Sequence, residues 1–432
     1  MKDLKILQNV ISNRYFYSFA FLFFFTPLIF SRSTNELFEF PKMFFVYIIG
    51  VLILGMFVLE KFLSNSKPKS MSLIPLLFLA SFIVSTLLSS HLYTSVWGYY
   101  TRFNDGLLSV LICAAMYLIA KDTLSTDQLD KIFKISIVSL IPIGLLGVSQ
   151  HFGLRFLWGG PAVDRVFSTF GQPNWMAQYI VLLLPLCVYY FVTSSTSWNR
   201  TVLWFFSAVF GFAGLWFSYS VSGVLSFIIC LPVFSLLFMR GLIQEKKSFI
   251  KFLLLSFIFA CTAIFNPGIF KDKVMDLQRD VQRFISQNIT VYAQDTPDTN
   301  VYKVSDPGFI RYGLWKGTLE LITSSPKVFL IGKGPETFPY EFQQYRSLDI
   351  NYSSEWNFVM NKPHNYYLEI WAETGIVGLA IYLIWCIYLL LKLPPKYRPG
   401  LIGFLVTNIF GWPTVAVNLL FWLMLARAET KI

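Results

Sequence analysis

The sequence predicts an all-α polytopic membrane protein with about twelve transmembrane helices and one large, partly helical extracytoplasmic loop before the last spans. Hydrophobic residues make up 55% of the 432 residues and charged residues only 14%, whereas soluble domains carry about 25% charged residues. Apolar runs of about 20 residues, the length that crosses a bilayer, recur along the chain. We therefore expect the lipid bilayer to be its main environment.

Apolar runs predict the spans in chain order. They lie near residues 15–31, 42–60, 71–90, 105–120, 131–150, 174–193, 201–219, 221–239, 249–266, 376–392, 399–409 and 411–427. The first run follows the basic residues Lys2, Lys5 and Arg14, and no small-residue cleavage site comes after it. This pattern indicates an uncleaved first span rather than a signal peptide.

One polar segment, residues 267–375, separates the early runs from the late ones. At roughly 100 residues it is far longer than an ordinary connection, and such loops are usually functional or disordered. Its aromatic residues and the helix-compatible stretches 272–287 and 309–322 predict an ordered loop. The expected organisation is a transmembrane bundle of about nine spans over 1–266, the loop with catalytic elements, and further spans over 376–432.

The connections between the predicted spans alternate along the chain between those rich in lysine and arginine and those poor in them. The rich connections contain Lys61, Lys67, Lys69, Lys121, Lys131, Lys134, Arg200, Arg240, Lys246, Lys247, Lys251, Lys392, Lys396 and Arg398. The positive-inside rule then predicts that both termini are cytoplasmic and that the large loop faces the extracytoplasmic, periplasmic side of the inner membrane. It also accounts for the net charge of +11. No basic cluster is interleaved with aromatic residues, so we expect no nucleic-acid partner.

Several site classes find no support in the sequence. The five cysteines lie in apolar runs without a CxxC pair, which argues against a disulfide framework and against a zinc site. The sequence has no P-loop, GxGxxG or Asp-x-Asp motif, and we expect no cofactor and no metal. It also has no internal repeat and no carboxylate near the centre of a span, which disfavours a transporter.

His364 is one of three histidines, all on the predicted outer side. Pro363 precedes it, residues 364–374 are compatible with a helix that Gly375 ends, and a new span then begins. Glu369 and Glu373 share a face of this helix, but neither shares a clean face with His364. His364 is therefore either an interfacial anchor or a catalytic base, and the glutamates are expected to act as scaffold.

Three arginines lie on the same predicted side. Arg165 precedes a span whose helix Asn174 is expected to cap, and it either snorkels to the interface or holds a phosphate. Arg311 opens the helical stretch in the loop. Arg102 lies near Asp105, with which it either forms a structural ion pair or contributes to a site.

The turn Gly332-Lys-Gly-Pro335 follows the Arg311 stretch. Taken alone it is read as an ordinary loop turn, and the alternative is that the backbone N–H groups at Gly332 and Gly334 face an anion. Together with the arginines and His364, this turn predicts a site for a phosphorylated, membrane-bound substrate and a base.

The sequence resembles the O-antigen ligase / O-antigen polymerase superfamily of bacterial membrane glycosyltransferases. The blocks that carry the resemblance are Gly171–Ala177 (GQPNWMA), Gly332–Phe338 (GKGPETF) and His364–Leu379 (HNYYLEIWAETGIVGL). The last block is the most specific, and the layout with one large loop before the final spans matches as well.

The resemblance implies transfer of a glycan from undecaprenyl pyrophosphate to an acceptor such as lipid A core, on the outer face of the cytoplasmic membrane. It implies an inverting, metal-independent enzyme in which His364 is the base and Arg311, Arg165 and Arg102 hold the pyrophosphate. Many members carry a Ser-Arg pair where this chain has Ser218–Gly223 (SYSVSG), without an arginine. Either Arg165 or Arg102 would then have to take its part, or the chain is a divergent member of the family.

Other functions remain open from the sequence. A polysaccharide polymerase and a protein O-oligosaccharyltransferase would use the same kind of donor on the same side of the membrane, so a ligase is the first of three readings. A transporter or flippase of lipid-linked sugars is the alternative from a different class.

Overall fold

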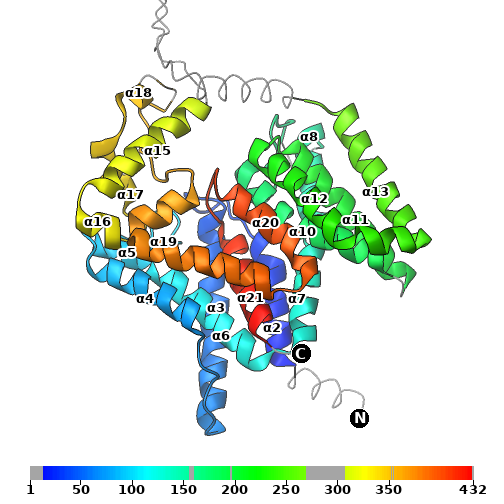
Figure 1. Cartoon of the computed structure of the whole chain (residues 1–432), viewed down its shortest axis with the longest axis horizontal. Helices are drawn as coiled ribbons and strands as arrows, with labels where there is room; N and C mark the ends of the chain where they lie inside the picture. Colours follow the sequence, from blue (N-terminus) through cyan, green and yellow to red (C-terminus); the bar gives the residue numbers. More distant parts are fainter. Residues whose placement is uncertain are drawn as a thin grey trace, which may run out of the picture.

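A computed structural model describes residues 13–154, 160–194, 197–268, 307–351, 353 and 355–430. Every element assigned in these described ranges is a helix, which confirms the all-α class (Figure 1). The predicted helical stretch 272–287 lies outside the described residues.

The chain forms its helices in three groups. Before the large loop these are α2 (Arg14–Phe25), η1 (Thr26–Leu28), α3 (Glu39–Leu63), α4 (Leu73–Leu87), α5 (Leu92–Trp97), α6 (Leu107–Thr123), α7 (Thr126–Val138), α8 (Leu140–Phe152), α10 (Pro173–Thr193), α11 (Trp198–Phe217), α12 (Val221–Gln244) and α13 (Lys246–Phe265). In the loop they are α15 (Pro307–Thr323), α16 (Pro326–Ile331), α17 (Phe338–Glu341), η2 (Phe342–Tyr345) and α18 (Leu348–Asn351). After it come α19 (Tyr366–Lys392), η3 (Pro395–Tyr397), α20 (Arg398–Thr407) and α21 (Val415–Glu429).

Seven helices in the described ranges are long and apolar enough to cross a membrane, as expected of a multi-pass membrane protein. They are Glu39–Leu63, Thr126–Phe152, Pro173–Thr193, Trp198–Phe217, Val221–Gln244, Lys246–Phe265 and Tyr366–Lys392. The predicted count of about twelve is not confirmed, because several apolar runs form shorter helices. The runs at 15–31 and 71–90 contain helices of 12 and 15 residues. A helix enclosed by protein is as apolar as one facing lipid, so hydropathy overcounts spans.

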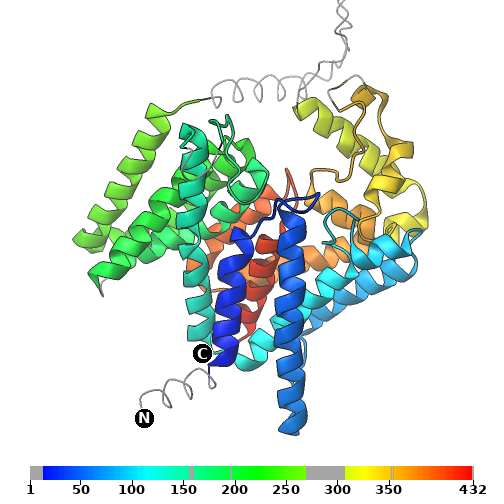
Figure 2. The ribbon, with the colours of Figure 1, turned by 180° about the vertical axis from the view of Figure 1, so that it is seen from behind.

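The last helix, α21, lies in the middle of the bundle. It packs against α2, α3, α6, α7, α10 and α19. Figure 2 shows it behind the blue helices α2 and α3. Most of its side chains are buried, which explains why a run near the end of the chain is strongly apolar although its helix has only 15 residues.

The described helices of the large loop, α15 to α18, lie at one end of the bundle beside α4, α5 and α19 (Figures 1 and 2). They share a small apolar core of Leu314, Leu321, Ile322, Phe338, Phe342 and Ile350. Helix α15 confirms the helix predicted at 309–322. The loop is therefore ordered over residues 307–351, as predicted.

Helix α19 carries the most specific sequence block. The Asn365 side chain caps it by accepting hydrogen bonds from the backbone N–H groups of Tyr367 (3.0 Å) and Leu368 (3.2 Å). The helix therefore begins at Tyr366 and not at His364, since Asn is a far better cap than a histidine. Gly375, with φ 73° and ψ 179°, breaks the helix where the sequence predicted a break, and helical residues continue directly beyond it.

Candidate functional site

His364 lies in the turn just before α19, with a backbone φ of 54° that is uncommon for a residue other than glycine. Its half-buried ring meets the ring of Trp412 edge to face, with 5.1 Å between their centroids. Both rings line a pocket between the start of α10 and the end of α20, together with Asn174, Trp175, Gln178 and Thr407. The turn conformation thus directs the imidazole toward a polar pocket.

Arg102 lies over the same pocket. Its guanidinium carbon is 5.5 Å from the centroid of the Trp175 ring and 5.6 Å from that of Trp412, and both rings line the pocket. The described structure has no salt bridge between Arg102 and Asp105, which corrects that alternative. Asp105 instead faces Lys362, with 3.7 Å between Oδ2 and Nζ. Two indole faces therefore hold Arg102 in place by cation–π contact.

Arg311 reaches the pocket from the large loop. It lies on α15, and its guanidinium carbon is 5.9 Å from the centroid of Phe410, another lining residue. The electrostatic effect of Arg311 and Arg102 on His364 shows that both charges lie near the imidazole. Residues more than 250 positions apart in sequence are thus brought to one pocket by the fold.

Arg165 approaches from the other side and is fixed by two hydrogen bonds. Its Nε donates to the Ser218 carbonyl (3.2 Å) and its Nη2 donates to Asn174 Oδ1 (3.2 Å). Ser220 Oγ donates to the same amide oxygen (2.7 Å). Burial lowers the pKa of Arg165, which nonetheless stays charged at neutral pH. Its guanidinium therefore lies against the Ser218–Gly223 segment, where the sequence lacks an arginine.

Asn174 does not cap its helix as predicted. Pro173 takes the first helical position of α10, so the cap falls on Gln172, whose side chain accepts from the Trp175 backbone N–H (3.2 Å). Asn174 is left free to line the pocket and to accept hydrogen bonds from Arg165 and Ser220. It connects one arginine to the wall of the His364 pocket.

The electrostatics of the pocket set the protonation state of His364. Burial, and then the positive charges of Arg311 and Arg102, lower its pKa to about 4. The imidazole is therefore neutral at neutral pH and has a nitrogen lone pair to accept a proton. An anion bound among the arginines would offset their charge and raise this pKa.

The turn at Gly332 and Gly334 does not present free N–H groups to an anion. The N–H groups of Gly332, Lys333 and Gly334 donate to the carbonyls of Val328 (2.9 Å), Ala372 (2.9 Å) and Glu373 (3.0 Å). Both glycines have positive φ. A Cβ on Gly332 would overlap the Glu373 carbonyl. The turn thus joins α16 to the kinked part of α19 and has a structural part in the site.

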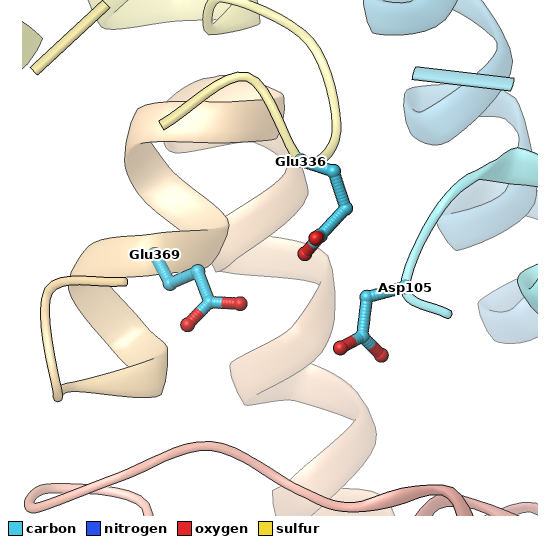
Figure 3. A group of neighbouring side chains, drawn as sticks. All are labelled: Asp105, Glu336 and Glu369. Carbon is cyan, nitrogen blue, oxygen red and sulfur yellow. The ribbon is translucent and has the colours of Figure 1, made fainter. Parts of the chain in front are cut away.

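The two glutamates of α19 belong to a buried charged cluster. Lys362 Nζ bonds to Glu336 and Glu369, and all three side chains are almost fully buried. Figure 3 shows the carboxyl groups of Asp105, Glu336 and Glu369 pointing toward one another from separate segments. Oxygens of these three lie within 4.8 Å of one another, close enough to share a metal ion. Glu373 also lies near Lys362.

Comparison with known proteins finds a family match over part of the chain. Residues 206–383 match the family model described as O-Antigen ligase, and a comparison with curated proteins finds no match. The family match confirms the resemblance to the O-antigen ligase superfamily and indicates a glycosyltransferase-like enzyme. The matched segment contains Arg311 and His364, whereas Arg102, Arg165 and Asn174 lie outside it.

Proposed function

We propose that this O-antigen-ligase-type membrane protein transfers a glycan from an undecaprenyl-pyrophosphate-linked donor to an envelope acceptor such as lipid A core. The reaction takes place on the outer face of the cytoplasmic membrane, with both termini in the cytoplasm. One observation carries the proposal: three arginines from different parts of the chain each contact a residue that lines the pocket of His364. Arg102 lies over Trp175, Arg311 lies over Phe410, and Arg165 donates to Asn174.

The proposed chemistry is a direct displacement at the anomeric carbon of the donor sugar. His364 removes the proton from the acceptor hydroxyl while that oxygen forms the new glycosidic bond. The bond between the anomeric carbon and the phosphate oxygen breaks, and undecaprenyl pyrophosphate leaves with the electron pair. Attack from the opposite face inverts the anomeric centre. The leaving group is already good, so the protein supplies position, positive charge and one base.

Arginine residues are suited to the leaving group. A guanidinium binds two phosphate oxygens at once and stays charged when partly buried. Arg102 and Arg311 lie near enough to lower the pKa of His364, so a pyrophosphate that contacts them would lie beside the base. Three arginines can neutralise the leaving group without a metal ion, and we propose that the transfer needs none.

Arg165 takes the part of the arginine missing from the Ser218–Gly223 segment. Its side chain comes from the loop before α10 but ends at the Ser218 carbonyl, with 3.2 Å between Nε and the oxygen. A guanidinium is therefore placed against this segment although the segment itself has none. We propose that Arg165 binds the pyrophosphate from this side.

The test is transfer of glycan by the purified protein in detergent, with a lipid-linked donor and a candidate acceptor. His364→Ala should reduce the rate of transfer by about 10²–10⁴-fold, the usual contribution of a general base. Arg311→Ala should also reduce it. The matched control is His91→Ala, because His91 stacks on Tyr340 and pairs with Glu341 away from the pocket. Full activity in folded His364→Ala protein would contradict the assigned role.

The product identifies the reaction type. Glycan on lipid A core indicates a ligase, a longer lipid-linked chain indicates a polymerase, and glycan on a hydroxyl of a protein indicates a protein O-oligosaccharyltransferase. Absence of any covalent product from folded protein supplied with each acceptor would favour transport of the lipid-linked sugar instead.

A further inference from the structure

A second cavity, of about 40 Å³, lies apart from the His364 pocket, between helices α4, α6, α19 and α21. Its polar lining includes Asn104, Asp105, Glu369, Glu373 and Asn418. Apolar residues such as Phe78 and Trp422 form the rest of the wall. This volume is large enough for a small ion or a water molecule but not for a sugar.

More carboxyl groups than cations surround this cavity. Lys362 lies among four carboxyl groups that act on it electrostatically, those of Asp105, Glu336, Glu369 and Glu373. The side chains of Lys362 and Glu369 are 1% and 2% exposed, so water does not screen them. Ionised carboxyl groups in such surroundings need compensation, which either protons or a second positive charge would supply.

Oxygen atoms without partners face the same place. Asp105 Oδ2, Glu369 Oε2 and Glu373 Oε1 are buried and accept no hydrogen bond. Asn104 is independent of the acidic cluster because it is neutral, yet its Oδ1 is also buried without a partner, and the residue is only 2% exposed. A buried oxygen in this state calls for a donor or a cation.

The bonds that Asp105 and Glu369 do make leave these oxygens available. Glu369 contacts Lys362 through Oε1, and its Oε2 is the unpartnered atom. Asp105 Oδ1 accepts from Asn418 Nδ2 (3.2 Å), and its Oδ2 lies 3.7 Å from the Lys362 ammonium, beyond hydrogen-bond distance. Lys362 thus satisfies one side of the cluster and leaves the other side open.

We propose that this cavity binds Ca²⁺ through oxygen atoms of Asn104, Asp105, Glu369 and Glu373. Carboxylate and amide oxygens are the ligands of hard cations. Ca²⁺ accepts irregular coordination at about 2.3–2.6 Å, whereas Mg²⁺ demands near-octahedral geometry and keeps its waters.

A bound ion here would connect the two segments that carry pocket residues. Asp105 follows Arg102 by three positions, and Lys362 precedes His364 by two. The cluster therefore joins the turn before α6 to the turn before α19. The cation site stands on this geometry alone, so it does not depend on the proposed glycosyl transfer.

The test is thermal unfolding of the full-length protein in detergent after treatment with EGTA. Adding Ca²⁺ should raise the Tm saturably, by about 3 °C at a hundredfold excess over the Kd. Mg²⁺ and Na⁺ at equal concentration should raise it less. Calorimetric titration should give one Ca²⁺ per chain. The same Tm with EGTA and with Ca²⁺, or an equal response to Mg²⁺, would overturn the proposal.

Variants distinguish Ca²⁺ binding in this cavity from adventitious Ca²⁺ binding elsewhere on the protein. Glu373→Gln and Asn104→Leu should each remove most of the Ca²⁺-dependent rise in Tm, so a loss of folding in one leaves the other informative. Glu341→Gln is the matched control, since Glu341 is paired with Lys333 outside the cavity, and it should respond like the unmodified chain.

An undiminished response in folded Glu373→Gln and Asn104→Leu would place the ion elsewhere. Stabilisation by acid alone, with no response to Ca²⁺ at any pH, would show that protons fill this role and would also overturn the proposal.

Discussion

The imidazole of His364 is held neutral by its surroundings before any substrate arrives. Burial and the charges of Arg311 and Arg102 lower its pKa to about 4, from an ordinary value near 6.5. A base with so low a pKa is weak, and general bases work best with a pKa near the operating pH. A pyrophosphate diester brings negative charge to the same arginines, so binding the donor should strengthen the base at the moment it is needed.

This coupling predicts different pH profiles for the free and the donor-bound protein. The neutral form of His364 is the active one, so activity falls as the pH falls. The acidic limb of kcat/KM should lie near pH 4, and that of kcat should lie at higher pH because bound pyrophosphate raises the pKa. Initial rates between pH 4 and 8 measure both. Coincident limbs would show that the bound anion does not act on His364.

Acid should also lower the stability of the folded protein, because the pKa of His364 is lower in the folded state than in the unfolded state. An unfolded histidine takes up a proton below about pH 6.5, whereas folded His364 does so only near pH 4. The unfolded state therefore binds more protons in this window, and stability falls as the pH falls through it. Each rate measurement in this range should be paired with a check that the protein is still folded.

At the scale of single residues, the sequence indicated candidate charged residues for the site but did not indicate which residues would contact them. His364, Arg102, Arg165 and Arg311 could be found because charge and histidine are rare in this chain. Trp412 could not be found, since it is one of 12 tryptophans. Lys362 and Glu336 were missed for another reason. Their importance comes from burial of the ion pair between residues 26 positions apart, which no local pattern reports.

Among the elements, α19 depends on a close approach of two backbones. Gly375 lies where the helix kinks, and a Cβ there would overlap the carbonyl of Leu330 in α16. Its φ of 73° and ψ of 179° belong to a region that is open almost only to glycine. The kink at Gly375 and the turn at Gly332 therefore pack directly against each other, which joins the large loop to the end of the bundle.

Gly375→Ala should destabilise the protein strongly. We expect a loss of about 2–4 kcal/mol, from backbone strain and overlap with Leu330 together. The matched control is Gly241→Ala, because Gly241 is exposed in α12 and a Cβ there meets no atom within 4 Å. That variant should be neutral or gain up to about 1 kcal/mol through helix propensity. Thermal unfolding in detergent compares them, and equal midpoints would show that the kink tolerates a side chain.

The sequence predicted the break in α19 correctly but not the residue at which the helix begins. The break at Gly375 was predictable because glycine is the residue that a non-helical turn requires. The start was not, since Pro363 and Asn365 both suit the beginning of a helix, and the side-chain hydrogen bonds of Asn365 decide between them. The same competition moved the cap of α10 from Asn174 to Gln172.

Viewed whole, the molecule has ion pairs at the end opposite the pocket. Lys61 pairs with Asp122 (2.5 Å), and Lys121 pairs with Glu429 (2.8 Å) at the last turn of α21. Helix α6 separates the two ends: the Arg102 segment precedes its first residue and Lys121 lies near its last. Its 17 residues span about 26 Å. The arginines that contact the pocket lining thus lie at the other end of α6 from these two ion pairs.

The sequence predicts this polarity better than it predicts the number of spans. Alternation of lysine and arginine between connections survives any error in helix length, because it depends only on which side a loop lies. The span count depends on separating lipid-facing from protein-facing helices, and α21 shows that composition does not do so. The all-α fold class was therefore predictable, the sidedness of the loops stays a prediction, and the arrangement of short buried helices was not predictable.

The orientation itself is the last prediction, and labelling of single cysteines measures it. Lys67 is exposed beyond the end of α3, and Gln344 is exposed in η2 of the large loop. In spheroplasts, a membrane-impermeant maleimide should label Gln344→Cys, and it should label Lys67→Cys only after the membrane is permeabilised. The background should carry Cys261→Ser, because the other four native cysteines are buried. The reverse pattern would place the His364 pocket in the cytoplasm, away from any donor on the outer face, and the proposed glycosyl transfer would fail with it.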